Sequence, residues 1–265
     1  VCSIGAVICY MLCYHMTTER VKVEQNTQKF SFKELISEIA HNKALIGIIV
    51  CALLFLLAQL SLSNMNNYIY PNYFGNVSAM SLANLAGMVV ILVLSTFIVK
   101  LSAKVGKKEL SVIGSIISAA AFLILFFIHT DNVWVWIVLV LISSVGTAMF
   151  NMVIWAMITD VIDDSEVRTG VRQDGTIYSV YSFARKLGQA CSSGISGVLL
   201  SIIGYTAATA HDPKVVDGIY NVTCLVPALG MILLFLALQF LYPLNKKRVE
   251  ENAKILKERR EAKVQ

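Results

Sequence analysis

The chain contains 265 residues, of which 57% are hydrophobic and only 15% are charged, and its mean hydropathy is +0.69. Soluble globular proteins average about 45–50% apolar and about 25% charged residues. The composition therefore excludes a soluble globular domain and indicates a protein whose surface faces lipid. The net charge of +5 does not indicate nucleic-acid binding, because no basic patch with interleaved aromatic residues accompanies it.

Charged residues occur in a few clusters separated by long uncharged stretches. A membrane-spanning helix needs about 20 mostly apolar residues, so the longest stretch, residues 44–99, has room for two spans. Each of the shorter stretches has room for one. We therefore expect an all-α, polytopic membrane protein. Its expected spans lie near residues 44–67, 79–100, 110–129, 133–157, 176–204 and 219–242.

Residues 1–16 are apolar as well, but they lack the basic region and the cleavage site of a signal peptide, and they do not begin with Met. We expect them to be the end of a further span, in a fragment whose upstream residues are missing. Residues 17–43 then form a polar connector, in which Ser31 and Glu34 make a capping box ahead of apolar residues at helical spacing. This pattern predicts an amphipathic helix on the inner membrane surface, with a partner-binding helix as the alternative.

Basic residues are distributed very unevenly between the two sides of the predicted topology. Among the 22 Lys and Arg residues, only Lys214 falls in a connection on one side. The others fall in segments 17–43, 100–108, 168–186 and 246–263. Under the positive-inside rule these segments are cytoplasmic, which places the chain in a cell membrane. The charged tail, residues 244–265, is expected to be a solvated cytoplasmic helix or coil.

The sequence carries no pattern typical of an enzyme or a metal site. Its six Cys residues lack the paired spacing of a zinc site, and its four His residues are scattered. A membrane-embedded enzyme would need a nucleophile and a base inside the spans, but the predicted span cores contain no Asp or Glu. We therefore expect neither catalysis nor a bound metal or cofactor.

The predicted span over residues 176–204 carries a polar stripe along one helix face. Its members are Tyr178, Ser182, Lys186, Gln189 and Ser193. Lys186 lies about 15 Å into the span at 1.5 Å per residue, and Arg185 adjoins it. A cation at mid-bilayer is unfavourable by about 2.5–3.5 kcal/mol. Snorkelling to the interface is one explanation, and a polar cavity that binds an anion or a hydroxyl-rich ligand is the one we favour. Such a cavity is typical of a transport pathway.

Two other spans contain polar groups with open interpretations. Asn64 and Asn67 end the first span in a segment rich in amides and phenols, where they line a cavity or lie at the membrane interface. Asn151 and Trp155 are four residues apart and share one helix face. Together they would hydrogen-bond and stack a sugar ring, or would serve only helix packing.

The segment before the polar span combines acids and bases over a short distance. It holds Asp160, Asp163, Asp164, Glu166, Arg168 and Arg172. We expect a short inner loop in which the acids face the bases. The cluster is either a solvated turn or a set of ion pairs that closes a cytoplasmic gate. Exposed ion pairs contribute only about 0.2–1 kcal/mol each, which suits a gate that must open.

This segment resembles the glycoside-pentoside-hexuronide cation symporters, a family that includes the melibiose carrier. The resemblance rests on Asp160-x-x-Asp163, Thr169-Gly170-x-Arg172-x-x-Gly175, Tyr178-Ser179 and Lys186-x-Gly188. The stretch that begins Tyr178-Ser-Val-Tyr-Ser-Phe-Ala-Arg, with Gly204-Tyr205 and Tyr242-Pro243-Leu244, is most similar to the glucuronide carriers of that family.

The resemblance implies the C-terminal half of a twelve-helix major facilitator superfamily transporter. Residues 1–16 would end helix six, residues 17–43 would be the middle loop, and residues 44–243 would be the C-terminal six-helix bundle. A sugar would enter a midplane site together with Na+ or H+, whose binding acids lie mainly in the N-terminal half. On the same basis Lys186, Ser182 and Tyr181 match pocket positions. The family's sugar-binding tryptophan position holds Asn151 here, so galactoside specificity does not carry over.

The function that these observations favour is symport of a hexuronide or another glycoside by alternating access. A hexuronide carries a carboxylate, which Lys186 or Arg185 would neutralise. Neutral glycosides or pentosides remain an alternative, since the same lysine occurs where the sugars are neutral. A sugar sensor built on a carrier fold is the other alternative, because it would keep the cavity and lose the coupling.

Overall fold

The computed structural model describes residues 2–17 and 42–264. Helix α1, Cys2–Met16, belongs to a first unit that ends at Ser37, and it is described by itself. It is apolar, and its large side chains are exposed within that unit. The helix predicted over residues 1–16 is therefore present. The amphipathic helix predicted within residues 17–43 lies outside the described residues.

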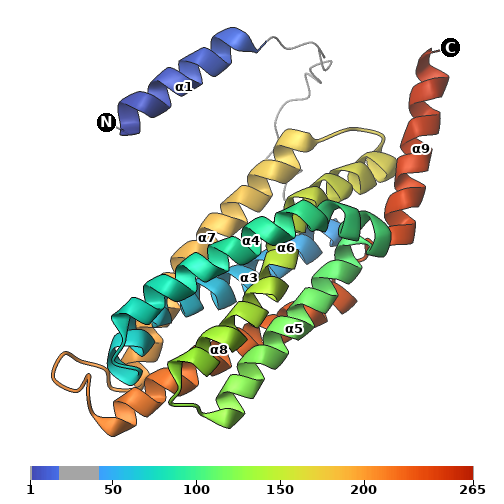
Figure 1. The fold of residues 1–265 in the computed structure, drawn as a ribbon. Coiled ribbons are helices and arrows are strands. Elements are labelled where there is room, and N and C mark those ends of the chain that lie inside the picture. The colour runs from blue at the N-terminus through green and yellow to red at the C-terminus, as the bar shows by residue number, and fades with distance from the viewer. Residues whose placement is uncertain (1, 18–41, 265) are drawn as a thin grey trace. The chain divides into compact units, whose positions relative to one another are not determined.

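The second unit is a bundle of long helices that runs from α3 to α9 (Figure 1). The helices are α3 (Lys43–Tyr68), which continues into the π-helical turn η1 (Ile69–Tyr73), α4 (Val77–Val105), α5 (Lys107–Ile128), α6 (Val133–Thr169), α7 (Asp174–Ile202), α8 (Pro213–Phe240) and α9 (Lys246–Val264). All six spans predicted between residues 44 and 242 correspond to the helices from α3 to α8.

Side-chain caps explain where several of these helices begin. The Oδ1 of Asn42 accepts a hydrogen bond from the Leu45 backbone N–H at 3.0 Å, and Asn76 caps α4 in the same way. Asn132 caps α6, and α8 begins at Pro213, which has no N–H to leave unpaired. Such caps satisfy backbone donors that the first helical turn cannot pair.

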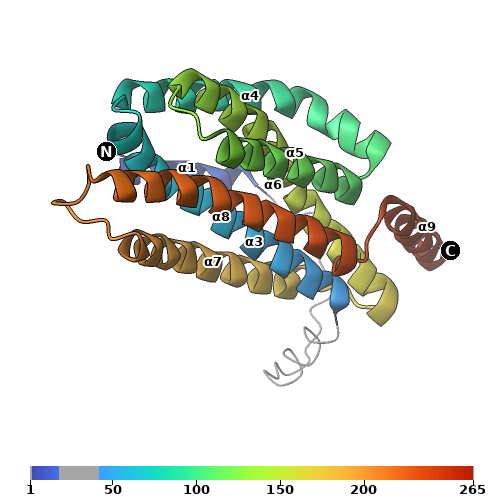
Figure 2. The same ribbon diagram turned by 90° about the horizontal axis from the view of Figure 1, so that it is seen from below.

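The bundle is built around α3, α5, α6 and α8. Helix α5 packs against α6 and α8, α3 packs against α7 and α8, and α4 packs mainly against α6. Figure 2 shows α4 and α7 on opposite sides of the bundle, with α3 and α8 between them. The α5–α6 crossing is especially close, because a Cβ on Gly114 would lie 2.5 Å from the carbonyl oxygen of Gly146. Small residues of this kind allow membrane helices to approach each other.

Helix α6 differs from the prediction because it continues 12 residues beyond the predicted end at residue 157. It ends at Thr169, where Gly170 adopts a left-handed conformation with φ of 75°. The segment expected to be an inner loop is therefore mostly helix, and only residues 170–173 connect α6 to α7. Polar residues past the end of a membrane span can extend the helix into water, since backbone hydrogen bonding requires no apolar surroundings.

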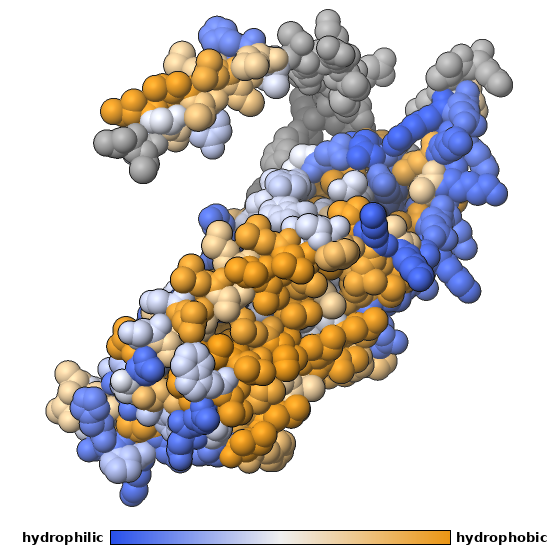
Figure 3. Space-filling model, in the orientation of Figure 1, coloured by the Kyte–Doolittle hydropathy of each residue, from blue (hydrophilic) through white to orange (hydrophobic). Residues whose placement is uncertain are grey.

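Five of the described helices, α3 with η1, α4, α5, α6 and α8, are long and apolar enough to cross a membrane. Helix α7 has 29 residues but is too polar to meet the same criterion. Figure 3 shows a broad hydrophobic surface over α4 and α5, with hydrophilic residues gathered at the two ends of the bundle. This distribution is that of a multi-pass membrane protein.

Candidate substrate site and charged gate

An aromatic and cationic group joins α6 to α7. The Trp155 ring on α6 stacks on the Tyr178 ring of α7 with centroids 5.7 Å apart, and Tyr181 meets Trp155 edge to face at 5.8 Å. The guanidinium carbon of Arg185 lies 4.9 Å from the centroid of the Trp155 ring. Arg185 also donates a hydrogen bond of 3.4 Å to the Tyr181 hydroxyl. We call these four residues the aromatic–arginine group.

Helical spacing explains how this group forms. Tyr178, Tyr181 and Arg185 are three and four residues apart on α7, so their side chains lie along one stripe. Tyr181 is fully buried against the bundle, whereas 43% of Trp155 and 48% of Tyr178 remain exposed. The group therefore presents an open aromatic face with a cation against it. Such a surface suits a ligand with an apolar ring face and a negative charge.

The other predicted residues of α7 lie beside this group on the open side of the helix. Lys186 is exposed and forms no hydrogen bond or ion pair with any described residue. Ser182 and Gln189 are partly exposed. A Cβ built on Gly188 would meet Leu53 of α3, but one built on Gly194 would meet nothing within 4 Å outside its own stretch of helix. This side of α7 is thus uncovered in the part of the chain that the structure describes.

The amides at the end of α3 have different surroundings from one another. Asn64 donates a hydrogen bond of 3.1 Å to the Ser196 hydroxyl, which ties α3 to α7, and Asn67 donates to backbone carbonyls of its own helix. Neither residue lines the cleft described in the next paragraph, whereas Asn66, which lies between them in sequence, does. Sequence spacing could not assign these roles, because three amides within four residues point to different sides of a helix.

A cleft of about 210 Å³ opens between α3, α4 and α6 and reaches α5 and α8. Its polar lining is made of amides and hydroxyls from α3, α4 and α6, and no charged residue contributes. Those polar residues are Gln59, Ser63, Asn66, Asn84, Ser143, Ser144, Thr147 and Asn151. We call this cavity the amide cleft. Of these polar residues only Asn151 was expected at a site from the sequence, although an isolated asparagine such as Asn84 within an apolar span was an available signal.

Asn151 connects the amide cleft to the aromatic–arginine group. It lines the cleft, and Trp155 follows it by four residues, about one helical turn along the same face of α6. The two residues therefore share one face of α6, and their joint contact with a sugar stays a prediction. The two polar regions lie next to each other along α6 rather than forming one continuous stripe on α7.

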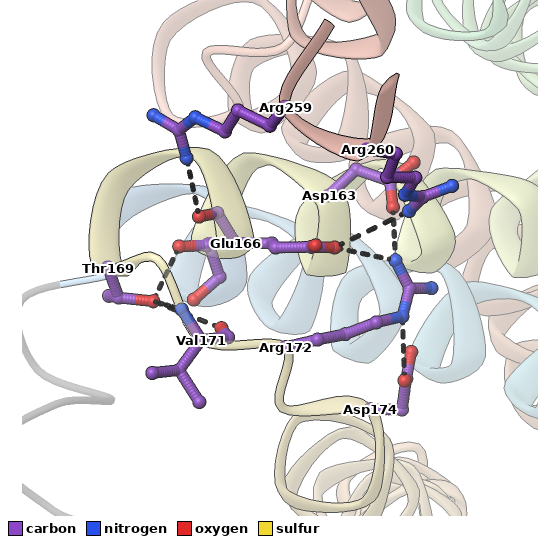
Figure 4. A network of polar contacts seen from close by, with 9 residues as sticks. Asp163, Glu166, Thr169, Val171, Arg172, Asp174, Arg259 and Arg260 are labelled. Atoms are coloured by element: carbon purple, nitrogen blue, oxygen red, sulfur yellow. Dashed lines mark hydrogen bonds and ion pairs between the residues drawn. The ribbon is translucent and has the colours of Figure 1, made fainter. Parts of the chain in front are cut away.

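The charged cluster at the far end of α6 is centred on Arg172 (Figure 4). Its guanidinium pairs with Asp163 and Glu166 at 2.9 Å and with Asp174 at 2.8 Å. Partial burial alone would lower the pKa of Arg172, but the hydrogen bonds from Glu166, Asp174 and Asp163 outweigh it and raise the pKa above its ordinary value. Arg172 therefore stays charged throughout the physiological pH range, and it holds the start of α7 against the end of α6.

The remaining acids pair with partners that the sequence did not suggest. Asp160 forms an ion pair of 2.6 Å with Lys107, at the start of α5. Arg168 pairs with Asp164 at 3.1 Å, but both lie on α6, four residues apart, and do not face each other across a loop. The expected loop geometry is wrong for this pair, because α6 remains helical through both residues.

The tail also differs from the solvated helix or coil that was expected. Helix α9 packs on the end of α6, where Leu256 is buried and Asn252 donates a hydrogen bond of 3.1 Å to Asp164. Arg248 pairs with the same carboxylate at 3.2 Å. Further along, Arg259 donates to the carbonyls of Glu166 and Val167, as Figure 4 shows for Glu166. The tail is therefore part of the charged cluster.

Nothing in the described ranges, residues 2–17 and 42–264, groups three or more His, Cys, Asp or Glu residues in a way that could hold a metal ion. Three groups of polar residues among those described bear on function: the aromatic–arginine group, the amide cleft and the charged cluster. The first two offer binding surfaces, and the third holds helix ends together by ion pairs.

Comparison with known proteins agrees with this arrangement. The family model for MFS/sugar transport proteins matches residues 1–246. An uncharacterized symporter of Bacillus subtilis (strain 168) is 31% identical over 89% of this chain and 51% of its own length. A glucuronide carrier protein homolog of Escherichia coli (strain K12) is 30% identical over 95% of this chain and 54% of its own length. A putative sulfoquinovose importer of the same E. coli strain is 28% identical, covering 93% and 53%.

These relatives are named as carriers, symporters or importers, so an enzyme is not indicated. The chain spans about half the length of the curated relatives it matches. The match and the helical bundle confirm the predicted half of a major facilitator superfamily transporter. The chain belongs to the MFS/sugar transport protein family.

Proposed function

We propose that this chain is the C-terminal half of a cation-coupled carrier for hexuronides and related glycosides. The observation that carries the proposal is the aromatic–arginine group, in which Arg185 lies over Trp155 beside Tyr178 and Tyr181. A sugar ring has an apolar C–H face that packs on an aromatic ring. A hexuronide adds a carboxylate, which a guanidinium binds with charge-assisted hydrogen bonds.

The uncovered side of α7 supports a site shared with a second half. Lys186, Ser182 and Gln189 face away from the bundle, and in a bilayer that surface needs water, a ligand or protein over it. A sugar held between two halves would meet this need. The coupling cation would be Na+ or H+, bound mainly by acids of the N-terminal half. In this chain, Lys186 would be the residue that interacts with the sugar and responds to the charge of the coupling cation.

The charged cluster supports alternating access, with the Lys-rich ends and the C-terminus on the cytoplasmic side of the cell membrane. In this account Arg172 and its three carboxylates hold the ends of α6 and α7 together when the site faces outward. Exposed pairs are worth only about 0.2–1 kcal/mol each, so the cluster can break and reform during a transport cycle.

The relatives are consistent with an anionic substrate. A glucuronide carries a carboxylate and sulfoquinovose carries a sulfonate, and these two compounds appear in the names of relatives that are 30% and 28% identical. Both anionic groups suit a guanidinium. A neutral glycoside or pentoside is the second candidate, and it is favoured by the amide cleft, whose lining is uncharged.

The test is uptake of labelled methyl and phenyl glucuronides by cells that express the gene from its natural start. Uptake is measured with and without sodium, at two pH values, beside a neutral galactoside. We expect accumulation of the glucuronides that collapses when one ion gradient is removed. Accumulation of the galactoside alone would favour the neutral alternative. Binding without accumulation of any sugar would contradict transport and favour a sensor.

Arg185 provides the matched variants. Replacing Arg185 with Gln should weaken glucuronide uptake by about 10- to 100-fold, since hydrogen bonds to charged groups contribute about 1.5–3 kcal/mol. Replacing it with Lys keeps the charge and loses the planar contact with Trp155, so an intermediate effect is expected. Equal uptake by the wild type and Arg185→Gln would contradict the proposed role of the arginine.

A further inference from the structure

The amide cleft contains more unpaired polar groups than helix packing requires. The side-chain amides of Gln59, Asn66, Asn84 and Asn151 line it, and none of them forms a hydrogen bond with another described residue. The Asn66 Oδ1 is buried and has no partner. An amide without partners at membrane depth is unfavourable, so these groups need water, a ligand or protein in the cleft.

The chemistry of the lining narrows the class of ligand that the cleft can bind. Amides both donate and accept hydrogen bonds, as sugar hydroxyls do. The hydroxyls of Ser144 and Thr147 donate to backbone carbonyls of α6, which leaves their oxygens free to accept. No carboxylate, Lys or Arg lines the cleft, so it offers nothing to neutralise an ion. Ile91, which is 46% exposed, and Val140 add apolar surface, which suits the C–H face of a ring.

The position of the cleft connects it to the proposed sugar site. Asn151 is in its wall, and Trp155 of the aromatic–arginine group lies one turn further along the same face of α6. One turn is about 5.4 Å, which is close to the length of one sugar ring. A two-ring ligand with its charged ring at Arg185 would therefore reach the cleft with its second ring.

We propose that the amide cleft binds the neutral, hydroxyl-bearing second ring of a disaccharide whose charged ring lies at Arg185. The inference rests on the proposed function and deepens it, because it makes the substrate a disaccharide that contains a uronic acid. The four amides are then hydrogen-bond partners of the neutral ring. A cleft that holds only water would leave a monosaccharide uronide as the whole substrate.

Gly87 provides a sharp test, because it lines the cleft on α4 and no described atom lies within 4 Å of a Cβ built on it. Gly87→Leu fills the cleft without a backbone clash and improves the helix propensity of α4. Gly87→Ala is the graded variant. Val89→Leu is the matched control, since Val89 is on the same helix and 59% exposed, and it does not line the cleft.

Uptake is measured in cells that express the full-length gene, with methyl glucuronide and with a disaccharide of glucuronic acid linked to a neutral hexose. The disaccharide is also tested as an inhibitor of methyl glucuronide uptake. We expect Gly87→Leu to raise the KM for the disaccharide more than tenfold and to leave methyl glucuronide uptake unchanged. Asn84→Leu, which removes one pair of hydrogen bonds, should raise the KM for the disaccharide about three- to tenfold. Val89→Leu should change neither the KM for the disaccharide nor the uptake of methyl glucuronide.

Several outcomes would overturn the inference. If Gly87→Leu leaves disaccharide uptake and inhibition unchanged while methyl glucuronide is transported, the cleft holds only water. If the wild type transports methyl glucuronide but neither transports nor binds the disaccharide, the second ring has no site. If the wild type accumulates neither compound, the proposed function fails, and the inference fails with it. If Gly87→Leu abolishes uptake of both compounds with normal protein in the membrane, the cleft is not specific for a second ring.

Discussion

Helices α4 and α7 have the same length, 29 residues, and lie on opposite sides of the bundle (Figure 2), yet they expose different kinds of side chain. Helix α4 exposes residues such as Leu85, Leu92 and Phe97 and is apolar enough to cross a membrane. Helix α7 exposes Lys186 beside apolar residues and does not meet the same criterion for a membrane span. A surface like that of α4 is stable against hydrocarbon, whereas the polar side of α7 needs water, ligand or protein. This difference is the basis of our proposal that the α7 side of the bundle faces the substrate pathway.

The largest expected effect comes from removing the cation that α7 exposes. Lys186→Ala should abolish coupled uptake, with a reduction of at least about 30-fold, because it would remove a cation that the carboxylate of a bound hexuronide would pair with, and the loss of one partner of such a pair is worth about 2–5 kcal/mol. Membrane insertion should be unchanged, since the span becomes more apolar. The measurement is glucuronide accumulation, normalised to carrier in the membrane by immunoblot. Near-normal accumulation would contradict the assignment of Lys186 to the substrate site.

A charge placed on α4 should give the next largest effect, and it tests whether the exposed surface of α4 faces lipid. Leu92→Lys, at a residue that is 58% exposed near the middle of α4, should be unfavourable by about 2.5–3.5 kcal/mol and should deplete the protein from the membrane. Ser193→Lys on the polar stripe of α7 is the matched variant and should be tolerated. Membrane abundance measures both. Equal abundance of the two variants would mean that α4 and α7 do not face different surroundings.

The aromatic face next to α7 should give an intermediate effect. Trp155→Ala removes the ring that contacts Tyr178 and Arg185, and cation–π contacts of this kind are worth about 0.5–2 kcal/mol. We therefore expect KM for glucuronide to rise about 3- to 30-fold. Trp134→Ala is the control, because Trp134 is on the same helix, is 58% exposed and lies outside the group. If both substitutions have the same effect on KM, Trp155 has no specific role.

The smallest effect on the KM for glucuronide is expected where α7 begins. Arg172→Gln removes three ion pairs that hold the α6–α7 connection, each worth about 0.2–1 kcal/mol. It should shift the carrier toward its inward-open state by about 3- to 150-fold and leave the KM for outside glucuronide within a few-fold. Arg168→Gln is the milder control, since Asp164 keeps Arg248 and Asn252. Thiol accessibility from the cytoplasmic side, in inverted vesicles, reports the shift, and an unchanged accessibility would argue against a gate.

The fold was largely predictable because the charge-free stretches and the caps both mark the helices. Each of the six predicted spans has its helix, and Asn42, Asn76 and Asn132 begin three of them. The end of α6 was missed because hydropathy falls at Asp160, although a helix in water needs only its backbone hydrogen bonds to continue. Periodicity inside a span finds faces, whereas helix ends outside the membrane follow from caps such as Gly170.

The candidate site was predictable only in part. Spacing placed Tyr178, Ser182 and Lys186 on one face of α7, and this face is open in the structure. It did not indicate that Trp155 would meet Arg185, because contacts between helices depend on crossing geometry that no local pattern encodes. For the same reason Asn66 and Asn84, which lie on different helices, were not recognised as neighbours in one cleft.

The docking of α9 was missed for a related reason. Its sequence is strongly charged, which is typical of a solvated tail. Arg248 and Asn252 are four residues apart, however, and so present one face to the buried carboxylate of Asp164. A charged helix can therefore pack when its partner is a buried acid. Only the structure supplies that partner.

The most direct test of the account is aqueous accessibility at matched positions on α7 and α4. Ser182→Cys and Leu92→Cys are introduced into a background in which all six native cysteines are replaced, and intact cells are treated with a membrane-impermeant maleimide. We expect the thiol at position 182 to react, phenyl glucuronide to protect it, and the thiol at position 92 not to react. Equal reactivity at the two positions, or reaction at position 182 that no glucuronide slows, would contradict the claim that α7 lines the substrate pathway.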